Sequence, residues 1–284
     1  MPKVILITGT STGLGVATAV QAAQAGHTVY ATMRNTQKRG TLDAAAQVAG
    51  VSLNVLQLDV QDTGSVNAAV DTVIAEQGHI DVLINNAGMG YVRSLEQAEE
   101  TDIQKILDIN YTGVTRCIKA VMPHMRKARA GHVINISSVG GLVGQPFNEI
   151  YCGAKFAVEG LTEAMASYIT PAFGIHFTAV EPGGIASEFA NTVLEQVEQT
   201  GGMLEDEYLP ILQKYIAGSQ NRQETGIYQT ADEVAAIVMK VMGSEHPPVR
   251  TRTSEWSEDF SKLKTGLDPD GLKQQSLVAE QFLK

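Results

Sequence analysis

Two side chains one helical turn apart, Tyr151 and Lys155, have the types and the spacing for proton transfer. If a helix begins near Glu149, they lie at i and i+4 on one face. An ammonium group beside a phenol stabilises the phenolate, so the pKa of Tyr151 is expected to fall from about 10 towards neutrality. Such a tyrosine can exchange a proton with a substrate oxygen. Ser138, which closes an apolar run thirteen residues upstream, can hold the same oxygen.

The alternative for this stretch is a core tyrosine followed by a lysine whose stem lies along the surface. The pattern Y-x-x-x-K is common by chance, so its interpretation depends on the rest of the chain. Neighbouring side chains have simpler roles. Cys152 is expected to pack in the interior, and Ser137 is expected to point to the opposite side of its strand from Ser138.

The elements that would position these side chains begin with an apolar run at residues 4–7, typical of a strand buried on both faces. The sequence TGTSTGLG follows and opens an alanine-rich helix. Its glycines allow a tight turn and the close approach of a pyrophosphate to the helix N-terminus, which favours a nucleotide-binding loop over a plain turn. The residues expected to bind the cofactor here are Gly9, Ser11, Thr12, Gly13, Leu14 and Gly15.

The second predicted strand, residues 28–33, ends at Met33-Arg34. A carboxylate at this point would hold the ribose 2′-hydroxyl of NAD, whereas an arginine binds the 2′-phosphate of NADP. No acidic residue is present, so NADP(H) is favoured over NAD(H). The alternative is a solvent-exposed arginine.

Two more strands, residues 53–58 and 80–84, end in polar or small residues. Asp59, followed by Val60, is expected either to accept a hydrogen bond from adenine or to cap the next helix. The fourth strand runs into a turn of small residues and amides that suits contact with a cofactor. The predicted cofactor residues of this turn are Asn86, Ala87 and Gly88.

A long helix is expected to carry Ile103, Ile106, Asn110, Val114 and Ile118 on one stripe. Asn110 is polar within that apolar face, so it is either structural or an anchor for a proton relay. The fifth strand, residues 131–138, leads to Tyr151, and a sixth, residues 176–180, leads to a Glu-Pro-Gly-Gly turn. Its predicted cofactor residues are Pro182, Gly183, Ile185 and Ser187.

This alternation of strands and helices predicts one α/β domain over residues 1–284, a Rossmann-type doubly wound parallel sheet with helices on both faces. Residues 188–229 interrupt the pattern and are expected to form an apolar substrate lid. A helix is expected at 230–242, an edge strand at 249–251 and a helical extension at 254–284.

Composition excludes several classes of protein. The net charge of −10 and the pI of about 5.1 argue against nucleic-acid binding. No run approaches the ~18 apolar residues of a membrane span, and the N-terminal apolar run is expected to be a strand and not a signal peptide. Two cysteines suit a reducing cytoplasm, and the six histidines lack metal-ligand spacing, so no metal is expected.

With these motifs assembled, the chain resembles the short-chain dehydrogenase/reductase family. The matching segments are TGTSTGLG, NNAG, Asn110, Ser138 with YCGAK, and EPGG. SVGGLVGQPFN, YCGAKFAVEGL, VYATMRN and LDPDG are similar to the branch of 17β-hydroxysteroid dehydrogenase type 1 and photoreceptor retinol dehydrogenase. Two departures from the family pattern concern the cofactor: Ser187 stands where a threonine is usual, and Thr12 stands where a basic residue is usual. A third is Gly218, which stands where the steroid enzyme has a histidine that holds the distal steroid oxygen. This third departure argues against estradiol as substrate.

The resemblance implies an oxidoreductase that transfers a hydride between a nicotinamide and a hydrophobic alcohol, ketone or aldehyde. It implies that Tyr151 exchanges the proton and that Ser138 polarises the carbonyl. Lys155 would lower the pKa of Tyr151 and bind the nicotinamide ribose, and Asn110 would position a relay water. A redox sensor that binds NADP without catalysis would need the glycine loop but not these four side chains. A sugar-nucleotide epimerase would need another loop and a larger C-terminal domain.

A homodimer, or a tetramer built from it, is expected through the helices at residues 110–127 and 151–173. Each carries apolar residues on more than one face, and one of those faces would be free to pair. The residues concerned are Cys117, Val121, Met125, Phe156, Leu161 and Met165.

Overall fold

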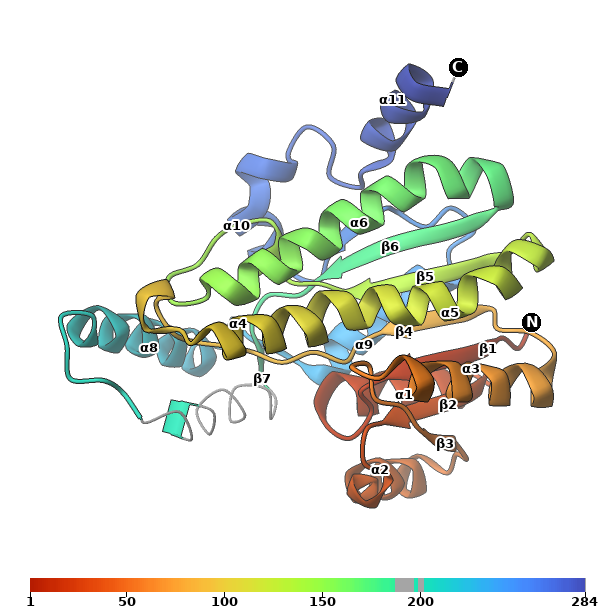
Figure 1. Cartoon of the computed structure of the whole chain (residues 1–284), viewed down its shortest axis with the longest axis horizontal. Coiled ribbons are helices and arrows are strands. Elements are labelled where there is room, and N and C mark those ends of the chain that lie inside the picture. Colours follow the sequence, from red (N-terminus) through yellow and green to blue (C-terminus); the bar gives the residue numbers. More distant parts are fainter. Residues whose placement is uncertain (187–196, 199–201, 284) are drawn as a thin grey trace.

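The computed structural model describes residues 1–186, 197–198 and 202–283. Seven parallel strands form one sheet in the order β3-β2-β1-β4-β5-β6-β9 (Figure 1). The predicted α/β class with a parallel sheet is confirmed. The strands are β1 (Val4–Thr8), β2 (Thr28–Met33), β3 (Asn54–Gln57), β4 (Val82–Asn85), β5 (Gly131–Ile136), β6 (Ile175–Glu181) and β9 (Arg250–Arg252), with β7 (Ile185–Ala186) and β8 (Gln229–Thr230) pairing separately.

Helices cover both faces of the sheet. On one face lie α3 (Thr63–Gln77), α5 (Gly113–Ala128) and α6 (Glu149–Phe173), and on the other lie α1 (Gly13–Gln24), α2 (Gly40–Ala49) and α9 (Ala231–Gly243). The other α-helices within residues 1–186 and 202–283 are α4 (Glu100–Leu107), α8 (Leu209–Glu224), α10 (Glu255–Thr265) and α11 (Leu272–Leu283).

The two cores follow from the alternation of side chains along each strand. In β1, Leu6 faces the helices α3, α5 and α6, whereas Ile5 and Ile7 face α1, α2 and α9. All three are completely buried. Each such burial stabilises the fold by about 1.5–3 kcal/mol. The continuous apolar run of β1 therefore serves two cores at once, as the sequence predicted.

The helix expected from Ile103 to Ile118 is interrupted. It consists of α4, a π-helical turn at Asp108–Thr112 and α5, and Asn110 lies in the π turn. A π turn inserts one extra residue, which a simple 3.6-residue stripe does not reveal. The fifth strand also ends earlier than expected, at Ile136, so Ser138 lies in the following turn.

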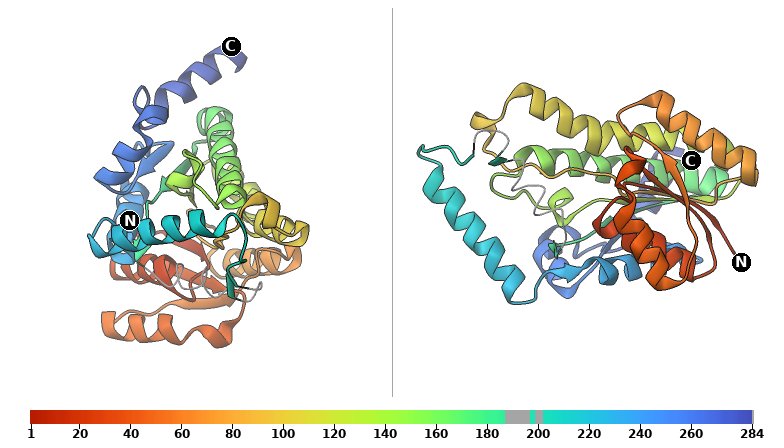
Figure 2. Two further views of the ribbon diagram at one scale, coloured as in Figure 1. Left: turned by 90° about the vertical axis from the view of Figure 1, so that its left-hand side faces the viewer. Right: turned by 90° about the horizontal axis from the view of Figure 1, so that it is seen from below.

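The C-terminal elements lie at opposite ends of α6. Helix α8 lies beyond the carboxyl ends of the strands, near the first turn of α6, where Asn148 Nδ2 donates to Tyr215 Oη at 2.8 Å (Figure 1). Helix α11 packs beside the other end of α6, where Gln275 Nε2 donates to Ala166 O at 2.7 Å (Figure 2). Part of the predicted lid, residues 187–196 and 199–201, lies outside the described residues.

Two features are absent from the described residues. Across residues 1–186, 197–198 and 202–283, no helix is both long and apolar enough to span a bilayer. The same part of the chain contains no group of three or more histidine, cysteine, aspartate or glutamate residues placed to hold a metal ion.

Candidate active site

The turn after β5 brings Ser138 to Tyr151. Ser138 begins a 3-10 turn at Val139–Gly141, and its Oγ accepts a hydrogen bond from Gly140 N at 3.0 Å. Its own proton therefore remains available for donation. Phe147, with a φ of 61°, reverses the chain before α6 begins at Glu149. Tyr151 lies in the first turn of α6, near enough to Ser138 for the serine hydroxyl to lower the pKa of Tyr151.

Lys155 follows one turn later on the same helix, as predicted. Its Nζ lies 5.7 Å from the centroid of the Tyr151 ring and donates a hydrogen bond to Ile136 O at 2.8 Å. The side chain is buried, and burial lowers the pKa of Lys155 to about 8, while nearby Glu159 acts in the opposite direction. The lysine is thus held between the tyrosine ring and the end of β5.

The expected fall in the pKa of Tyr151 does not occur in the protein chain alone. Burial raises the pKa of Tyr151 to about 12, and the nearby Ser138 hydroxyl opposes this rise without cancelling it. Lys155 Nζ is bonded to a backbone carbonyl and lies 5.7 Å from the ring centroid, so its charge does not bring the pKa of Tyr151 below the ordinary value. The sequence-based expectation of a near-neutral pKa is therefore wrong for the chain without cofactor.

Asn110 is fully buried and bound to the segment that follows β4. Its Oδ1 accepts from Met89 N at 2.8 Å, and its Nδ2 donates to Met89 O at 2.7 Å. Gly88 lies between Asn110 and Lys155. A Cβ added to Gly88 would be 3.4 Å from Asn110 Oδ1 and 3.8 Å from Lys155 Nζ. The structure therefore brings Asn110 to the lysine side of the site, where it binds the Met89 backbone, and its role in a proton relay stays a prediction.

The glycine loop forms a narrow cradle between β1 and α1. Gly9 has a φ of +72°, and a Cβ there would lie 2.7 Å from Ala87 Cα. Gly15 has no space for a side chain because Gly9 O and Asn86 Nδ2 occupy it. Thr12 precedes α1 without capping it through its side chain, so the first helical amides remain free to bind an anion. Gly13 begins α1, and Leu14 is buried beneath it.

Asn86 fastens this loop to the end of β4. Its Nδ2 donates to Thr8 O at 3.0 Å and to Gly9 O at 2.9 Å. Thr8 Oγ1 in turn accepts from the backbone amides of Asn86 and Ala87 at 3.1 and 3.0 Å. Both N–H groups of the Asn86 amide are therefore engaged by the protein itself.

Arg34 lines a cavity of about 250 Å³ beside the glycine loop. Sequence reasoning had included Ser11 and Arg34 but had missed Lys38, a second cation in the lining. Lys38 could have been found from the sequence by its spacing, because it lies four residues after Arg34 and the 3-10 turn Thr36–Lys38 carries it back towards the arginine. The full lining is Ser11, Met33, Arg34, Asn35 and Lys38.

The two alternatives for Asp59 are now distinguishable. Helix α3 is capped by Asp62, whose Oδ1 accepts from Gly64 N at 2.8 Å, so the capping role proposed for Asp59 is wrong. Asp59 Oδ1 accepts from Gln61 N at 3.0 Å. Val60 is buried against Gly113 at the start of α5. The contact of Asp59 with adenine stays a prediction.

The turn after β6 lies against both the catalytic segment and the C-terminal region. Pro182 O accepts from Val139 N at 2.9 Å. A Cβ on Gly183 would be 2.9 Å from Ser257 Oγ, and Ile185 begins the short strand β7. Ser187, the last predicted cofactor residue, lies outside the described residues.

The family of the chain follows from comparison with known proteins. A model described as short chain dehydrogenase matches residues 3–198. The chain belongs to the short-chain dehydrogenase family. Its fold agrees, because a short-chain dehydrogenase from Streptomyces avermitilis superposes with a TM-score of 0.78 at 28% identity, covering 99% of this chain and 98% of that one. An actinorhodin polyketide ketoreductase with NADPH gives a TM-score of 0.75 at 26% identity, covering 88% and 94%.

Three characterised relatives of this short-chain dehydrogenase match nearly its whole length. Retinol dehydrogenase 8 of Bos taurus is 38% identical and covers 95% of this chain and 87% of its own. The 3-ketodihydrosphingosine reductase of Bacteroides thetaiotaomicron is 36% identical and covers 97% of both chains. The 17-beta-hydroxysteroid dehydrogenase type 1 of Homo sapiens is 36% identical and covers 94% and 82%. The predicted family and branch are confirmed.

In this short-chain dehydrogenase, α8 adds polar side chains that sequence reasoning did not assign to the site. Tyr215 lies near enough to Tyr151 to raise the pKa of Tyr151, and its own pKa is raised by burial. Tyr228 packs on Gly184 and shares a 2.7 Å hydrogen bond with Ser219. Tyr215 stood among scattered apolar residues in the sequence, and only the contact with Asn148 identifies it.

Proposed function

We propose that the protein is an NADP(H)-dependent oxidoreductase that interconverts a lipophilic ketone or aldehyde with its alcohol. The observation that carries the proposal is the placement of the Ser138 hydroxyl beside Tyr151, with Lys155 one turn away at the carboxyl edge of the sheet. A glycine loop shaped for a pyrophosphate lies at the same edge.

The roles of the side chains follow from their geometry. Ser138 keeps a proton that it can donate to a substrate carbonyl, which polarises the carbonyl carbon. Tyr151, protonated at neutral pH because burial raises its pKa, donates the second hydrogen bond and then the proton. Lys155 holds a positive charge beside the developing phenolate. When bound, NADPH supplies the hydride.

The residues around the glycine loop fit a nicotinamide dinucleotide. Gly9 and Gly15 leave the backbone open where a Cβ would fill the cradle, and the free amides at the start of α1 can hold a diphosphate. Arg34 and Lys38 line a cavity without a carboxylate, which supports NADP(H) over NAD(H). Asp59, Val60, Ala87, Gly88, Pro182, Gly183, Ile185 and Ser187 are proposed to contact the rest of the cofactor.

A lipophilic substrate is supported by two observations. The three relatives are named for retinol, a 17β-hydroxysteroid and 3-ketodihydrosphingosine, which all carry a hydroxyl or keto group on a largely hydrocarbon skeleton. In this chain, Met203, Leu204 and Ile211 expose apolar side chains in and before α8, at the end of the sheet where the substrate would enter. A lid over residues 188–229 remains part of the proposal.

The proposal is tested by following the absorbance of reduced nicotinamide with a panel of carbonyl compounds. We expect the protein to oxidise NADPH with at least one of a 17-ketosteroid, a retinal and a 3-ketosphingoid base, and to leave a small hydrophilic ketone unreduced. If NADPH binds but no carbonyl compound is reduced, the protein is instead a non-catalytic sensor of the cofactor.

We also propose a homodimer, built through α6, that can associate further into a tetramer. Cys117, Val121 and Met125 of α5 do not form a free face, because all three are buried against the sheet. Phe156 and Tyr168 on α6, by contrast, are 41% and 48% exposed. Sedimentation at micromolar concentration should give a particle of twice the 30.4 kDa chain mass or more. A monomer under those conditions would refute the dimer.

A further inference from the structure

Two acidic side chains, Glu159 and Glu181, are buried together behind the active site. Glu159 lies one helical turn after Lys155 on α6, and Glu181 is the last residue of β6. The residues are 6% and 0% exposed. The carboxyl groups interact directly, and a Cβ on Gly141 would be 3.1 Å from Glu159 Oε1. The catalytic mechanism uses neither residue.

A proton shared by Glu159 and Glu181 explains how two buried carboxyl groups can lie side by side. As carboxylates, both oxygens of Glu159 and Oε1 of Glu181 lack a hydrogen-bond partner, although the Ser137 hydroxyl, which is also unpartnered, lies near Glu159 and acts to lower its pKa. Buried acceptors without donors are rare, and two adjacent buried carboxylates repel each other strongly. A proton on one carboxyl group turns this repulsion into a hydrogen bond.

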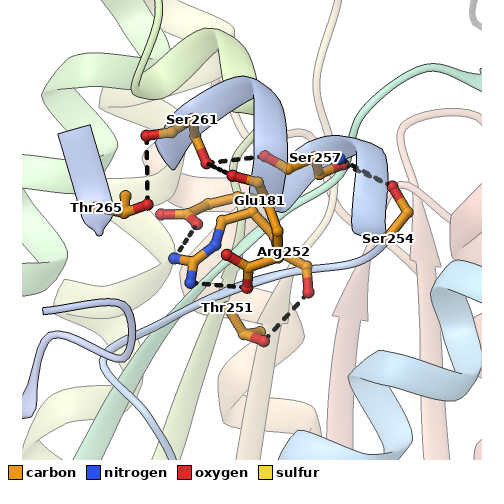
Figure 3. A network of polar contacts seen from close by, with 8 residues as sticks. Glu181, Thr251, Arg252, Ser254, Ser257, Ser261 and Thr265 are labelled. Carbon is orange, nitrogen blue, oxygen red and sulfur yellow. Dashed lines mark hydrogen bonds and ion pairs between the residues drawn. The ribbon is translucent and has the colours of Figure 1, made fainter. Parts of the chain in front are cut away.

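The surrounding charges place that proton on Glu159. Arg252, whose side chain is 2% exposed, donates from Nη1 to Glu181 Oε2 at 3.1 Å and from Nη2 to Glu258 Oε1 at 2.9 Å (Figure 3). Glu181 therefore has a cation in contact. Among the described residues no cation forms an ion pair with Glu159, and Lys155, whose Nζ is bonded to Ile136 O, interacts with Glu159 only at longer range.

The remaining charged groups near the pair do not change this assignment. On α6, Glu163 is neutralised by Arg250 of β9 at 3.0 Å. Glu258 on α10 is half exposed and bound to Arg252. Burial raises the pKa of Glu159 well above its ordinary value, and it raises the pKa of Glu181 only to about 7, against the opposing effect of Arg252.

The pair joins the catalytic helix to the proposed cofactor loop. Glu181 directly precedes residues 182–185, and Ser137 N and Val139 N donate to Val180 O and Pro182 O at 2.7 and 2.9 Å. The inner side of α10 covers Glu181 and Arg252 with small hydroxyl side chains (Figure 3). Any repulsion between the carboxyl groups therefore acts between α6 and that loop.

We propose that Glu159 and Glu181 are positioning residues whose single shared proton holds the Lys155 helix and residues 182–185 at the spacing that NADP(H) requires. The inference rests on the proposed cofactor role of those residues. Loss of the proton leaves two carboxylates facing one guanidinium and pushes the helix and the loop apart. Cofactor affinity then falls at alkaline pH, by up to about ten-fold for each pH unit beyond this ionisation.

Glu159→Gln tests the shared proton, because the amide keeps the shape and a donor towards Glu181 but cannot ionise. We follow NADPH binding by nicotinamide fluorescence and expect the affinity of Glu159→Gln to fall less steeply with rising pH than that of the wild type. At the highest pH of the titration the two affinities should differ by about ten-fold. The loss that remains in the variant belongs to Lys155, whose pKa is lowered to about 8. Glu163→Gln, on the same helix, is the matched control and should retain the wild-type profile.

Thermal unfolding tests the assignment without any cofactor. The raised pKa of Glu159 favours its neutral form in the folded state, so this stability is complete below the ordinary pKa of about 4.5 and falls as the pH rises. Glu159→Gln should therefore gain in midpoint temperature over wild type as the pH increases. Glu181→Gln removes the buried one of the two carboxylates paired with Arg252 and should lower the midpoint by roughly 6–15 °C.

The outcomes separate this inference from the proposed function. The shared proton is refuted if Glu159→Gln keeps the wild-type pH profile of NADPH binding or loses as much thermal stability as Glu181→Gln. Reduction of carbonyl compounds in the panel above would then still support the proposed function. If the wild type binds no NADPH, the proposed function and the positioning role fail together, and the thermal midpoints still decide which residue carries the proton.

Discussion

Replacing Tyr151 with phenylalanine should lower kcat for carbonyl reduction by about 10²–10⁴-fold, because the ring remains but the proton donor is lost. NADPH affinity should stay close to that of the wild type. Steady-state assays with a saturating carbonyl substrate measure kcat, and fluorescence titration with NADPH measures the affinity for the cofactor. Tyr168→Phe is the matched control, since Tyr168 lies on the same helix and is 48% exposed. Retention of most activity by Tyr151→Phe would mean that another group transfers the proton.

The pH dependence of reduction follows from the same site. Tyr151, with its pKa raised to about 12, stays protonated throughout the accessible range and is ready to donate. Lys155, with its pKa lowered to about 8, loses its charge as the pH rises through that value, so the reduction rate should decline there. Lys155→Arg keeps a charge and should remove the decline even if the rate is lower. A wild-type rate that is constant well beyond that pH would show that the charge of Lys155 is not required.

Arg34→Asp should reverse the preference for cofactor. A charge-assisted contact of this kind contributes about 1.5–3 kcal/mol, so NADPH should bind about 10–150-fold more weakly, and NADH should bind more tightly to the new carboxylate. Lys38→Ala should weaken NADPH binding by less, because its ammonium is a single point charge in the same cavity.

Arg39→Ala provides the control for Arg34→Asp. Arg39 is exposed and already paired with Asp43 at 2.7 Å, so its loss should leave the cofactor preference unchanged. Fluorescence titrations of the wild type, Arg34→Asp, Lys38→Ala and Arg39→Ala with NADPH and with NADH measure these cofactor preferences. Equal affinity of the wild type for NADH and NADPH would show that Arg34 does not recognise the 2′-phosphate.

Most of the sheet could be predicted because its signals are local. The apolar runs of β1, β2 and β6 and the glycine loop are recognisable in a few adjacent residues. The helix predicted at 230–242 begins with a capping box, in which Thr230 Oγ1 accepts from Glu233 N and Glu233 Oε2 accepts from Thr230 N, so its start likewise depends on four consecutive residues.

The features that could not be predicted depend on contacts between distant segments. The π turn at Asn110 is held by Met89, twenty-one residues away. Lys38 is a second cation of the cofactor cavity because the folded chain places it with Arg34 in the wall of the same cavity. Glu159, at i+4 from Lys155, suggests an ordinary helical ion pair in sequence, and only the approach of β6 reveals its true neighbour, Glu181. The pKa of Tyr151 similarly depends on burial by elements far away in sequence.

The two hydrogen bonds from Asn86 to Thr8 and Gly9 have a consequence for how fast and how tightly a dinucleotide can bind. They fix the backbone of the glycine loop through protein contacts alone. A flexible loop would lose about 1–2 kcal/mol of conformational entropy for each residue ordered on binding. A loop that is already ordered avoids that loss, so its preorganisation lets the anion contacts at the start of α1 contribute more fully to affinity.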